Sequence, residues 1–525
     1  MQVTAGMSLS AVELAILISR VESICAEMGA VLQHAAFSPN IKDRLDYSCA
    51  LFDARGDLYA QAAHIPVHLG SMAYAMASIV DGVDWQAGDM LVLNDPFLGG
   101  THLPDVTVVA PLFVGTQLVS FVVNRAHHAN IGASTPGSMP ISRSITEEGV
   151  IIPPTLMVRD GVLLPAAEQI FKQLQGTDTS GDFAAQISAN RIGLARLEQL
   201  VVHQGLNVFF AGIIAINDYG QRLAEAFLRE IPTGQYRYQD VMDGDGFGAE
   251  DVLIDLCLDV SPTGVVADFS GTSAQVEGNI NCPLSVAAAA VYYVFRCLLP
   301  AQTPACAGTF RSISIKAPVG SLVNAQRPAA TAAGNVETSM RIVDTVLGAL
   351  AQAIPSLIPA ASQGTMNNVA MGNHQAQPIW DYYETLAGGM GASQGHDGLS
   401  AVQSHMTNTL NTPIESLEQH YPLRVLEYSI RRGSGGAGAQ SGGEGLVREF
   451  EFLGPAELTL LTERRSHKPW GLAGGGPGAT GRNWLDGVEL PAKVHISVKA
   501  GQVLRMETPG GGGYGEPVEI QKKVC

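Results

Sequence analysis

The sequence is poor in charged residues, which make up 15% of its 525 positions, and acidic residues outnumber basic ones by 49 to 31. The formal net charge of −18 argues against a nucleic-acid partner, because phosphate backbones require a basic surface. Long hydrophobic runs are also absent. The longest, at residues 285–299, is interrupted by Arg296 and is shorter than the roughly 18 residues that a transmembrane helix needs. We therefore expect neither nucleic acid nor a membrane among the partners.

Cysteine is sparse, and its spacing gives no metal-binding pattern. The cysteines are odd in number, scattered, and never spaced as Cys-x-x-Cys. This pattern indicates reduced thiols in a cytoplasmic protein and disfavours a cysteine metal cluster. The seven residues are Cys25, Cys49, Cys257, Cys282, Cys297, Cys306 and Cys525.

A nucleotide-binding loop is also missing from the sequence, although it contains 58 glycines. The glycine-rich segments match neither the P-loop pattern GxxxxGKS/T nor a GxGxxG turn between a strand and a helix. We expect these segments to be sheet turns and surface loops; the alternative is close approach of the backbone to a substrate or partner. They lie at residues 388–391, 435–436, 442–443, 474–478 and 510–515.

Hydrophobic periodicity predicts the elements of the first half of the chain. Apolar positions three and four apart predict a helix over residues 10–34, in which Ser10 and Glu13 are placed to form a capping box. Gly115-Thr116 is the expected turn of a later hairpin. Another helix is expected at residues 72–80, and strands at residues 46–52, 90–93, 106–113 and 118–124.

The rest of the chain is predicted to be helical from residue 184 to residue 230 and then richer in strands. Further helices are expected at residues 284–299 and 339–354, and further strands at residues 252–260, 265–269, 426–431, 446–452, 458–462, 494–498 and 503–507. These elements predict a mixed α/β (α+β) fold. We expect an N-terminal domain at residues 1–240, a central α/β domain at residues 241–420 and a β-rich domain at residues 421–525.

One segment of the N-terminal domain concentrates side chains that carry chemistry. It reads NDPFLGGTHLPD from Asn94 to Asp105, and RAHH follows the predicted hairpin at residues 125–128. A two-residue loop would pair Asp105 with Ala126, and a loop longer by one residue would pair it with His127. Because one residue of register decides which face His127 takes, the sequence leaves this pairing open.

His102, Asp105 and His127 form a mixed nitrogen and oxygen set of the kind that binds zinc, manganese, iron or cobalt. The alternative is a trio of ordinary polar residues at strand ends. Since neighbouring residues of a strand point to opposite sides, only one of His127 and His128 is expected among the ligands. The other is a candidate outer-shell or acid–base group.

Other candidates lie nearby in the sequence. Asp46 precedes a predicted strand and could supply a fourth, oxygen ligand; the alternative is a local ion pair with Arg44. His64 and His68 are four apart, as helical ligand pairs are, but Pro66 disfavours a helix. A loop that reaches the site is therefore the functional interpretation of these histidines, and a surface position is the alternative.

Acidic residues supply the candidates for a general base. Glu147 and Glu148 precede Gly149, and the alternative to a catalytic role is an exposed turn. Asp95 is expected to accept hydrogen bonds from amide groups of its own loop.

These motifs resemble the hydantoinase B/oxoprolinase family, and the resemblance covers essentially the whole chain. Its longest motif is the segment at residues 94–105 with residues 126–128. The other matching segments are SPNIKDRLDYSC at residues 38–49, DFSGTS at 268–273, GNIN at 278–281, AGNVETS at 333–339 and TPGGGGYG at 508–515.

The resemblance implies a subunit of a larger enzyme. Members of the family are B-type subunits of ATP-dependent N-methylhydantoinases, lactamases and 5-oxoprolinases, and more distant relatives are metal-bearing subunits of acetone and acetophenone carboxylases. A separate A-type subunit is implied to bind ATP and magnesium in a hetero-oligomer, expected to be a dimer of heterodimers. The missing phosphate loop fits this division. The ligands of the carboxylase branch carry over onto His102, Asp105 and His127, and Asp46 is carried over as a further metal-site residue.

The implied reaction is the hydrolysis of a cyclic amide whose carbonyl oxygen the A-type subunit has phosphorylated. A divalent metal would lower the pKa of water, and His128 or Glu148 would accept the proton as catalytic residues. One alternative is a ketone carboxylase subunit, which would consume bicarbonate along with ATP. Another is a non-catalytic scaffold, which has no reason to retain metal.

Overall fold

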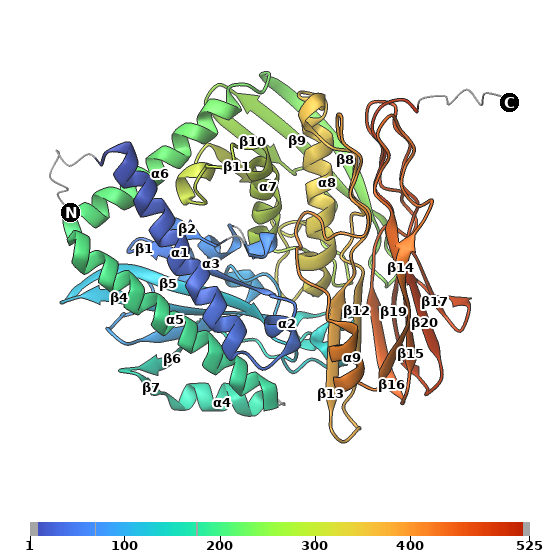
Figure 1. Cartoon of the computed structure of the whole chain (residues 1–525), viewed down its shortest axis with the longest axis horizontal. Helices are drawn as coiled ribbons and strands as arrows, with labels where there is room; N and C mark the ends of the chain where they lie inside the picture. The colour runs from blue at the N-terminus through green and yellow to red at the C-terminus, as the bar shows by residue number, and fades with distance from the viewer. Residues whose placement is uncertain (1–8, 63, 69, 175–176, 518–525) are drawn as a thin grey trace.

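A seven-stranded antiparallel sheet forms the centre of the N-terminal part of the chain (Figure 1). The computed structural model describes residues 9–62, 64–68, 70–174 and 177–517. All strands predicted for the first half of the sequence are present, with slightly different bounds. In spatial order the sheet consists of β2 (Leu58–Gln61), β1 (Tyr47–Asp53), β5 (Gln117–His127), β4 (Asp105–Val114), β3 (Met90–Leu93), β6 (Thr155–Arg159) and β7 (Val162–Leu163).

Helices cover both faces of this sheet. In β1, Cys49 and Leu51 pack against α1, while Ala50 and Phe52 pack against α3 on the other face. This alternation follows from the strand geometry, because successive side chains point to opposite faces. Helix α5 packs beside α1, and α1 begins at the predicted capping box. The helices of this part are α1 (Ala11–Ala35), α2 (Pro39–Lys42), α3 (Ser71–Ile79), α4 (Pro165–Gln173) and α5 (Thr177–Gln204).

The predicted helical stretch at residues 184–230 contains a sharp bend. Gly205, with a left-handed φ of 84°, separates α5 from α6 (Leu206–Leu228), and the axes of the two helices differ by 109°. In the described ranges no single helix is long and apolar enough to cross a membrane, although this bent pair meets the criteria of length and composition when its halves are combined.

A second, four-stranded sheet packs against two buried helices in the middle of the chain. Its core contains apolar residues of β9 and β10 together with those of α7 and α8. Strand β8 has no counterpart in the sequence prediction, because it alternates polar and aromatic residues and has only one buried residue. These elements are β8 (Gly234–Gly244), β9 (Glu250–Ser261), β10 (Gly264–Asp268), β11 (Ile313–Lys316), α7 (Leu284–Leu298) and α8 (Ser339–Leu350), which follows the short π-helix η6 (Gly334–Thr338).

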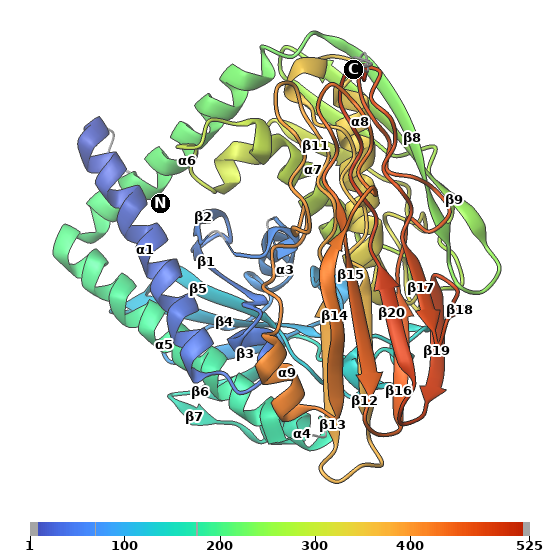
Figure 2. The ribbon, with the colours of Figure 1, turned by 45° about the vertical axis from the view of Figure 1, so that its right-hand side comes forward.

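Two further sheets stand side by side in the C-terminal part and share one apolar core (Figure 2). The first of these sheets contains strands from both sides of residue 420, and residue 240 lies within β8. The division into three domains, with boundaries after residues 240 and 420, stays a prediction. The first sheet has the order β13 (Trp380–Thr385), β12 (Asn368–Asn373), β16 (Ala456–Leu461), β19 (Lys493–Val498). The second has the order β14 (Leu423–Arg431), β15 (Gly445–Phe452), β20 (Val503–Glu507), β17 (Arg482–Leu485), β18 (Val488–Glu489), and α9 (Ile414–His420) precedes it.

Several glycine-rich segments pack against one another, backbone to backbone. Gly511 donates a hydrogen bond to the Gly443 carbonyl at 2.9 Å and accepts one from the Gly436 amide at 2.8 Å. A Cβ atom on Gly389 would lie 2.0 Å from the Gly443 oxygen, a distance that real side chains do not reach. The expectation of turns and surface loops is therefore wrong for these buried segments. The close approach of the backbone is to other glycines of the same chain.

The cysteines of the described ranges are all free thiols, as predicted; Cys525 lies outside these ranges. Cys25 in α1 and Cys49 in β1 are completely buried in the core between this helix and the sheet. Burial raises the pKa of both thiols above the ordinary value, which disfavours the reactive thiolate form.

Candidate metal centre

The β4–β5 hairpin brings Asp105 and His127 opposite each other. The turn has the shorter of the two predicted lengths, with Val114 paired to Gln117. A bulge next to Leu112 then shifts the register by one residue, so that Asp105 pairs with His127. Because directly opposed residues of an antiparallel pair point to the same face, both side chains lie on the α3 side of the sheet.

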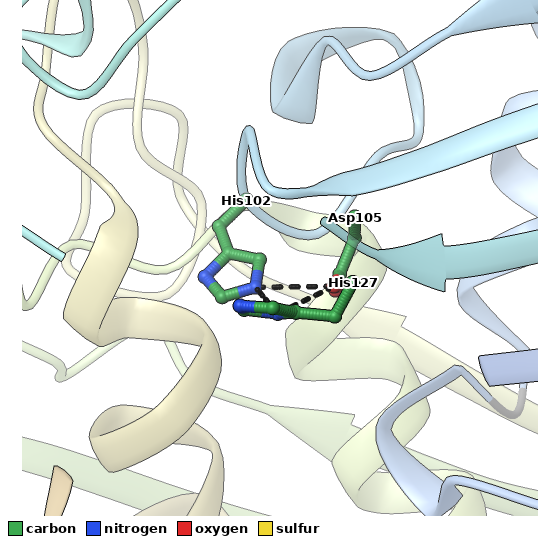
Figure 3. Close-up of side chains that lie close together, drawn as sticks. All are labelled: His102, Asp105 and His127. Carbon is green, nitrogen blue, oxygen red and sulfur yellow. Dashed lines mark hydrogen bonds and ion pairs between the residues drawn. The ribbon is translucent and has the colours of Figure 1, made fainter. Parts of the chain in front are cut away.

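Three donor atoms converge at the end of this hairpin (Figure 3). His102 Nε2 lies 3.2 Å from Asp105 Oδ1 and 3.2 Å from His127 Nδ1. The distance from His127 Nδ1 to Asp105 Oδ1 is 3.1 Å. All three residues are buried, so bulk water does not satisfy their polar atoms.

A divalent metal fits this donor set. Metal–ligand bonds of about 2.0–2.2 Å place neighbouring donors about 2.8–3.1 Å apart in octahedral coordination and about 3.3–3.6 Å apart in tetrahedral coordination. The observed separations of 3.1–3.2 Å lie between these two ranges, within about 0.1 Å of the octahedral one. Two imidazole nitrogens and one carboxylate oxygen suit zinc, manganese, iron or cobalt. The three residues predicted as ligands are therefore brought together in a geometry that could hold such an ion.

A tight loop places His102 in this cluster. The Asn94 side chain donates hydrogen bonds to the Leu103 and Val150 carbonyls, both at 2.9 Å, and accepts one from the Ile152 amide. Gly99 has a φ of 91°, and a Cβ there would lie 2.1 Å from the backbone nitrogen of Ala75. The NDPFLGG sequence thus allows the loop to pass closely over α3.

The second oxygen of Asp105 is also occupied. Thr101 Oγ1 donates a hydrogen bond to Asp105 Oδ2, and His68 Nε2 lies 3.3 Å from the same oxygen. His68 Nδ1 lies 2.9 Å from Ser48 Oγ. Burial alone would raise the pKa of Asp105, but His102, His127 and His68 hold it well below its usual range. The carboxylate is therefore ionised and fixed in orientation.

The outer nitrogen of His102 faces a backbone carbonyl, with Nδ1 3.3 Å from the Ala332 oxygen. A carbonyl only accepts hydrogen bonds, so Nδ1 carries the hydrogen and Nε2 presents its lone pair to the cluster. Burial would lower the pKa of His102, and the Asp105 carboxylate raises it above the ordinary value.

Glu148 contacts the backbone segment that faces the outer nitrogen of His102. Its Oε1 accepts hydrogen bonds from the Thr331 and Ala332 amides at 2.8 and 2.9 Å and from Ser142 Oγ at 2.8 Å. Burial raises the pKa of Glu148 to about 7. Glu148 is not an exposed turn residue, but it does not line the cavity at the cluster. The Ala332 backbone links it to the cluster, since the Ala332 amide donates to Glu148 and the Ala332 carbonyl faces His102.

His128 points away from the cluster, as the alternation along β5 requires. Its Nε2 lies 3.0 Å from Gln186 Oε1 in α5, and its ring contacts Phe183. Burial lowers the pKa of His128. The structure therefore does not bring this candidate acid–base group to the predicted ligands.

Other predicted candidates divide between the site and its surroundings. Asp46 lines the cavity beside the cluster but is not one of the three converging donors. His68 reaches the cluster, whereas His64 packs edge-on against Tyr47. Glu147 accepts a hydrogen bond from an exposed backbone amide. Asp95 accepts one from the Phe97 amide, as predicted, and also pairs with Arg327.

Segments far apart in the sequence complete the cavity, which has a volume of about 20 Å³. The ring of Tyr383 stacks on His127 with centroids 5.0 Å apart. Asn335 in the π-helix η6 has a buried Oδ1 without a hydrogen-bond partner. The motif at residues 333–339 was the available signal for Asn335, and no sequence signal marked Tyr383. Further lining residues are Thr385, Thr407 and Thr409.

The fold and site together describe a mixed α/β chain with a buried two-histidine, one-carboxylate centre between its N-terminal sheet and its later segments. The family model described as Hydantoinase B/oxoprolinase matches residues 10–517. The chain belongs to the hydantoinase B/oxoprolinase family.

The chain matches relatives of about its own length and relatives that are more than twice as long. It is 31% identical to a putative B-type subunit of a D-/L-hydantoinase from Pseudomonas sp. (strain NS671), with 96% of this chain and 90% of that protein covered. It is 39% identical to 5-oxoprolinase 1 from Arabidopsis thaliana, where 97% of this chain covers 42% of that protein. The chain thus spans less than half the length of the oxoprolinase.

Solved structures share the fold. An ATP-dependent caprolactamase from Pseudomonas jessenii superposes with a TM-score of 0.91 at 26% identity, covering 97% of this chain and 92% of that one. An acetone carboxylase in its nucleotide-free form gives a TM-score of 0.85 at 18% identity, covering 96% of this chain and 75% of that one. At this identity the second likeness concerns the fold alone.

Proposed function

We propose that this chain is the metal-bearing subunit of an ATP-dependent cyclic amide hydrolase of the hydantoinase, oxoprolinase or lactamase type. The observation that carries the proposal is the convergence of His102, Asp105 and His127 within 3.1–3.2 Å of one another. The likeness to a B-type hydantoinase subunit and to a caprolactamase supports a cyclic amide as the substrate.

The proposed partner is an A-type subunit that binds ATP and magnesium and phosphorylates the ring carbonyl. The hydantoinase relative, whose name describes one subunit of an enzyme, supports a separate partner, and so does the additional length of the oxoprolinase. We propose a hetero-oligomer built as a dimer of heterodimers. The free thiols of the described ranges support a cytoplasmic location.

His102, Asp105 and His127 would hold a divalent metal, with Asp46 as a further oxygen donor from the cavity wall. Such a metal supplies Lewis acidity when bound. The protein's contribution is orientation: Ala332 sets the tautomer of His102, while Thr101 and His68 hold the outer oxygen of Asp105. Fixed ligands of this kind keep their positions without further ordering when the ion binds.

Glu148 is proposed as a positioning residue rather than the proton acceptor of the reaction. Its carboxylate contacts the backbone of residues 331–332 and not the cavity. His128 lies on the other face of the sheet, so we assign it no proton transfer. Two carboxylates line the cavity, those of Asp105 and Asp46. Within the described ranges the side chain of Asp46, unlike that of Asp105, forms no hydrogen bond.

The test is co-expression of this chain with an A-type subunit, followed by metal analysis and a screen of hydantoins, oxoproline and lactams. We expect stoichiometric metal and ATP-coupled ring opening. Ala variants of His102, Asp105 or His127 should lose both. Intact metal content and turnover in these variants would contradict the proposal.

The same assay separates the alternatives. ATP-dependent consumption of bicarbonate with a ketone would identify a carboxylase subunit. Absence of metal from the purified complex, together with full activity, would identify a scaffold that completes the partner's site.

A further inference from the structure

Three threonine hydroxyls lie together in the wall of the cavity at the cluster. Thr385, at the end of β13, has its Oγ1 2.9 Å from Thr409 Oγ1. Thr409 Oγ1 lies 3.5 Å from Thr407 Oγ1. All three residues are buried and line the cavity. The hydroxyls therefore form a short row beside the proposed metal ligands.

A buried guanidinium stands behind this row. Arg44 Nη2 donates to Thr385 Oγ1 at 3.0 Å and to Thr409 Oγ1 at 3.4 Å. Its other hydrogen bonds go to the Tyr383 carbonyl and the Asn40 side chain, and its Nε has no partner among the described residues. Within the described ranges no carboxylate forms a salt bridge with Arg44, so the ion pair with Asp46, the alternative to a ligand role for that residue, does not form. A fully buried cation without an acidic partner is costly.

The hydrogen-bond capacity of the row leaves one hydroxyl proton unused. Three hydroxyls have three protons, and the two oxygen–oxygen contacts within the row can use only two of them. The other neighbours of the row, Arg44 and the Gln403 amide, are donors. Whichever way the hydroxyls turn, one proton has no acceptor within hydrogen-bond distance in the described part of the chain. Since all three threonines line the cavity, that proton is available to a ligand in it.

We propose that this threonine row donates a hydrogen bond to a negatively charged oxygen in the cavity, with Arg44 supplying the positive charge behind it. Hydrogen bonds to charged acceptors are the stronger ones, and the hydroxyls that accept from Arg44 are polarised toward donation. The proposal rests on the proposed function, because Asp46 and Asp105 also face the site and a bound metal is needed to offset their charge.

The charged oxygen has two possible sources in ring hydrolysis. It is either the attacking oxygen, which is the size of a water molecule, or an oxygen of the carboxylate product. The cavity volume of about 20 Å³ accommodates one water-sized group at a time. Fluoride is a probe for the first source and acetate for the second.

The experiment measures binding of fluoride and of acetate to the metal-loaded chain by calorimetry, with no ATP, partner or turnover. The variants are Thr385→Val, Thr407→Val and Thr409→Val, which keep the side-chain shape and remove one hydroxyl each. At least one should bind one of the anions about tenfold more weakly, and Ser at that position should restore binding. Thr303→Val is the control, because Thr303 is buried and its hydroxyl has no partner.

A loss confined to fluoride assigns the row to the attacking oxygen, and a loss for acetate assigns it to the carboxylate product. If all folded, metal-loaded variants bind both anions within about twofold of the parent, the proposal is wrong. For a variant that does not fold, crystal structures of the metal-loaded parent chain with fluoride and with acetate replace it: both anions placed away from all three hydroxyls overturn the proposal. The two proposals can fail separately. If the co-expressed parent complex hydrolyses a ring but the threonine variants bind both anions normally, this inference alone is wrong. If a threonine variant binds an anion more weakly but the parent complex hydrolyses no ring, the proposed function alone is wrong.

Discussion

Two buried polar clusters in this chain differ in how their charges are compensated. We call the candidate metal centre formed by His102, Asp105 and His127 the metal cluster. The charge cluster lies between α8, β8 and the segment after β16, and it consists of Arg341, Arg464, Lys493, Asp240, Asp344 and Glu463. Both are buried to a similar degree, so burial alone does not distinguish a candidate site from a structural element.

The charge cluster is internally balanced. Arg341 contacts Asp240 and Glu463, each at 3.3 Å, and Arg464 and Lys493 have acidic partners of their own. Three cations thus face three carboxylates. In the metal cluster, by contrast, one ionised carboxylate and two imidazoles direct their donor atoms toward one point, without a lysine or arginine. A buried cluster whose charges cancel holds the fold together, whereas a cluster of converging donors suits an added cation.

The largest expected effect is at the metal cluster. Asp105→Asn keeps the side-chain shape and removes the charge, and we expect metal affinity to fall at least about 100-fold with loss of ATP-coupled turnover. Metal analysis after dialysis measures the effect. Asp81→Asn, at an exposed position, is the matched control. Unchanged metal content in Asp105→Asn would remove the distinction between the two clusters.

The next effect is on folding. Glu463→Gln leaves Lys493 and one side of Arg341 without a buried counter-charge, and we expect a loss of about 3–5 kcal/mol in the free energy of unfolding. Urea denaturation measures it. Glu457→Gln, whose side chain is 40% exposed, should cost less than about 1 kcal/mol. The folded Glu463→Gln fraction should keep its metal; a loss of metal without a loss of stability would reverse the two roles.

A pH dependence should arise beside the charge cluster. Burial, and then the charge of Glu463, raise the pKa of Glu337 to about 8 from 4.5. The folded chain therefore binds this proton more tightly than the unfolded chain does. The stabilisation is complete below pH 4.5 and is lost as the pH rises to about 8, with a slope of up to about 1.4 kcal/mol per pH unit.

Glu337→Gln should remove this slope, because its side chain stays neutral. Denaturation at several pH values between 5 and 8 tests the expectation. Glu489→Gln, at an exposed position in β18, should leave the slope as in the parent. An equal slope in Glu337→Gln and the parent would show that Glu337 is already ionised in the folded chain.

The smallest effect is expected behind the metal cluster. Glu148→Gln weakens the hold on the Ala332 backbone and hence on the tautomer of His102. We expect about tenfold weaker metal binding, the lower end of effects seen for outer-shell partners, with little change in stability. The neighbouring Glu147→Gln is an exposed control. Equal affinities for these two variants would mean that Glu148 does not position the ligand.

The sequence could predict which polar side chains lie near one another at the site. The spacing of His102 and Asp105, and the apolar alternation around Gly115-Thr116, indicated a hairpin with His127 near its end. The choice between the two registers could not be made, because the bulge beside Leu112 depends on how β4 and β5 pack between helices. The glycine-rich segments were misjudged for a similar reason, since their close contacts join segments distant in the chain.

The sequence by itself determined which residue types meet at the candidate metal centre and most of the main helices and strands. The family resemblance, with which the absent phosphate loop agrees, led to the expectation that ATP binds on another subunit. Only the tertiary structure decided that His127 faces the cluster while His128 faces α5, because one bulge changes the register of the whole strand pair. It also decided the rest of the cavity wall. Tyr383 and Thr409 reach the site of His127 through packing between the N-terminal sheet and later segments, and sequence periodicity does not record such long-range contacts.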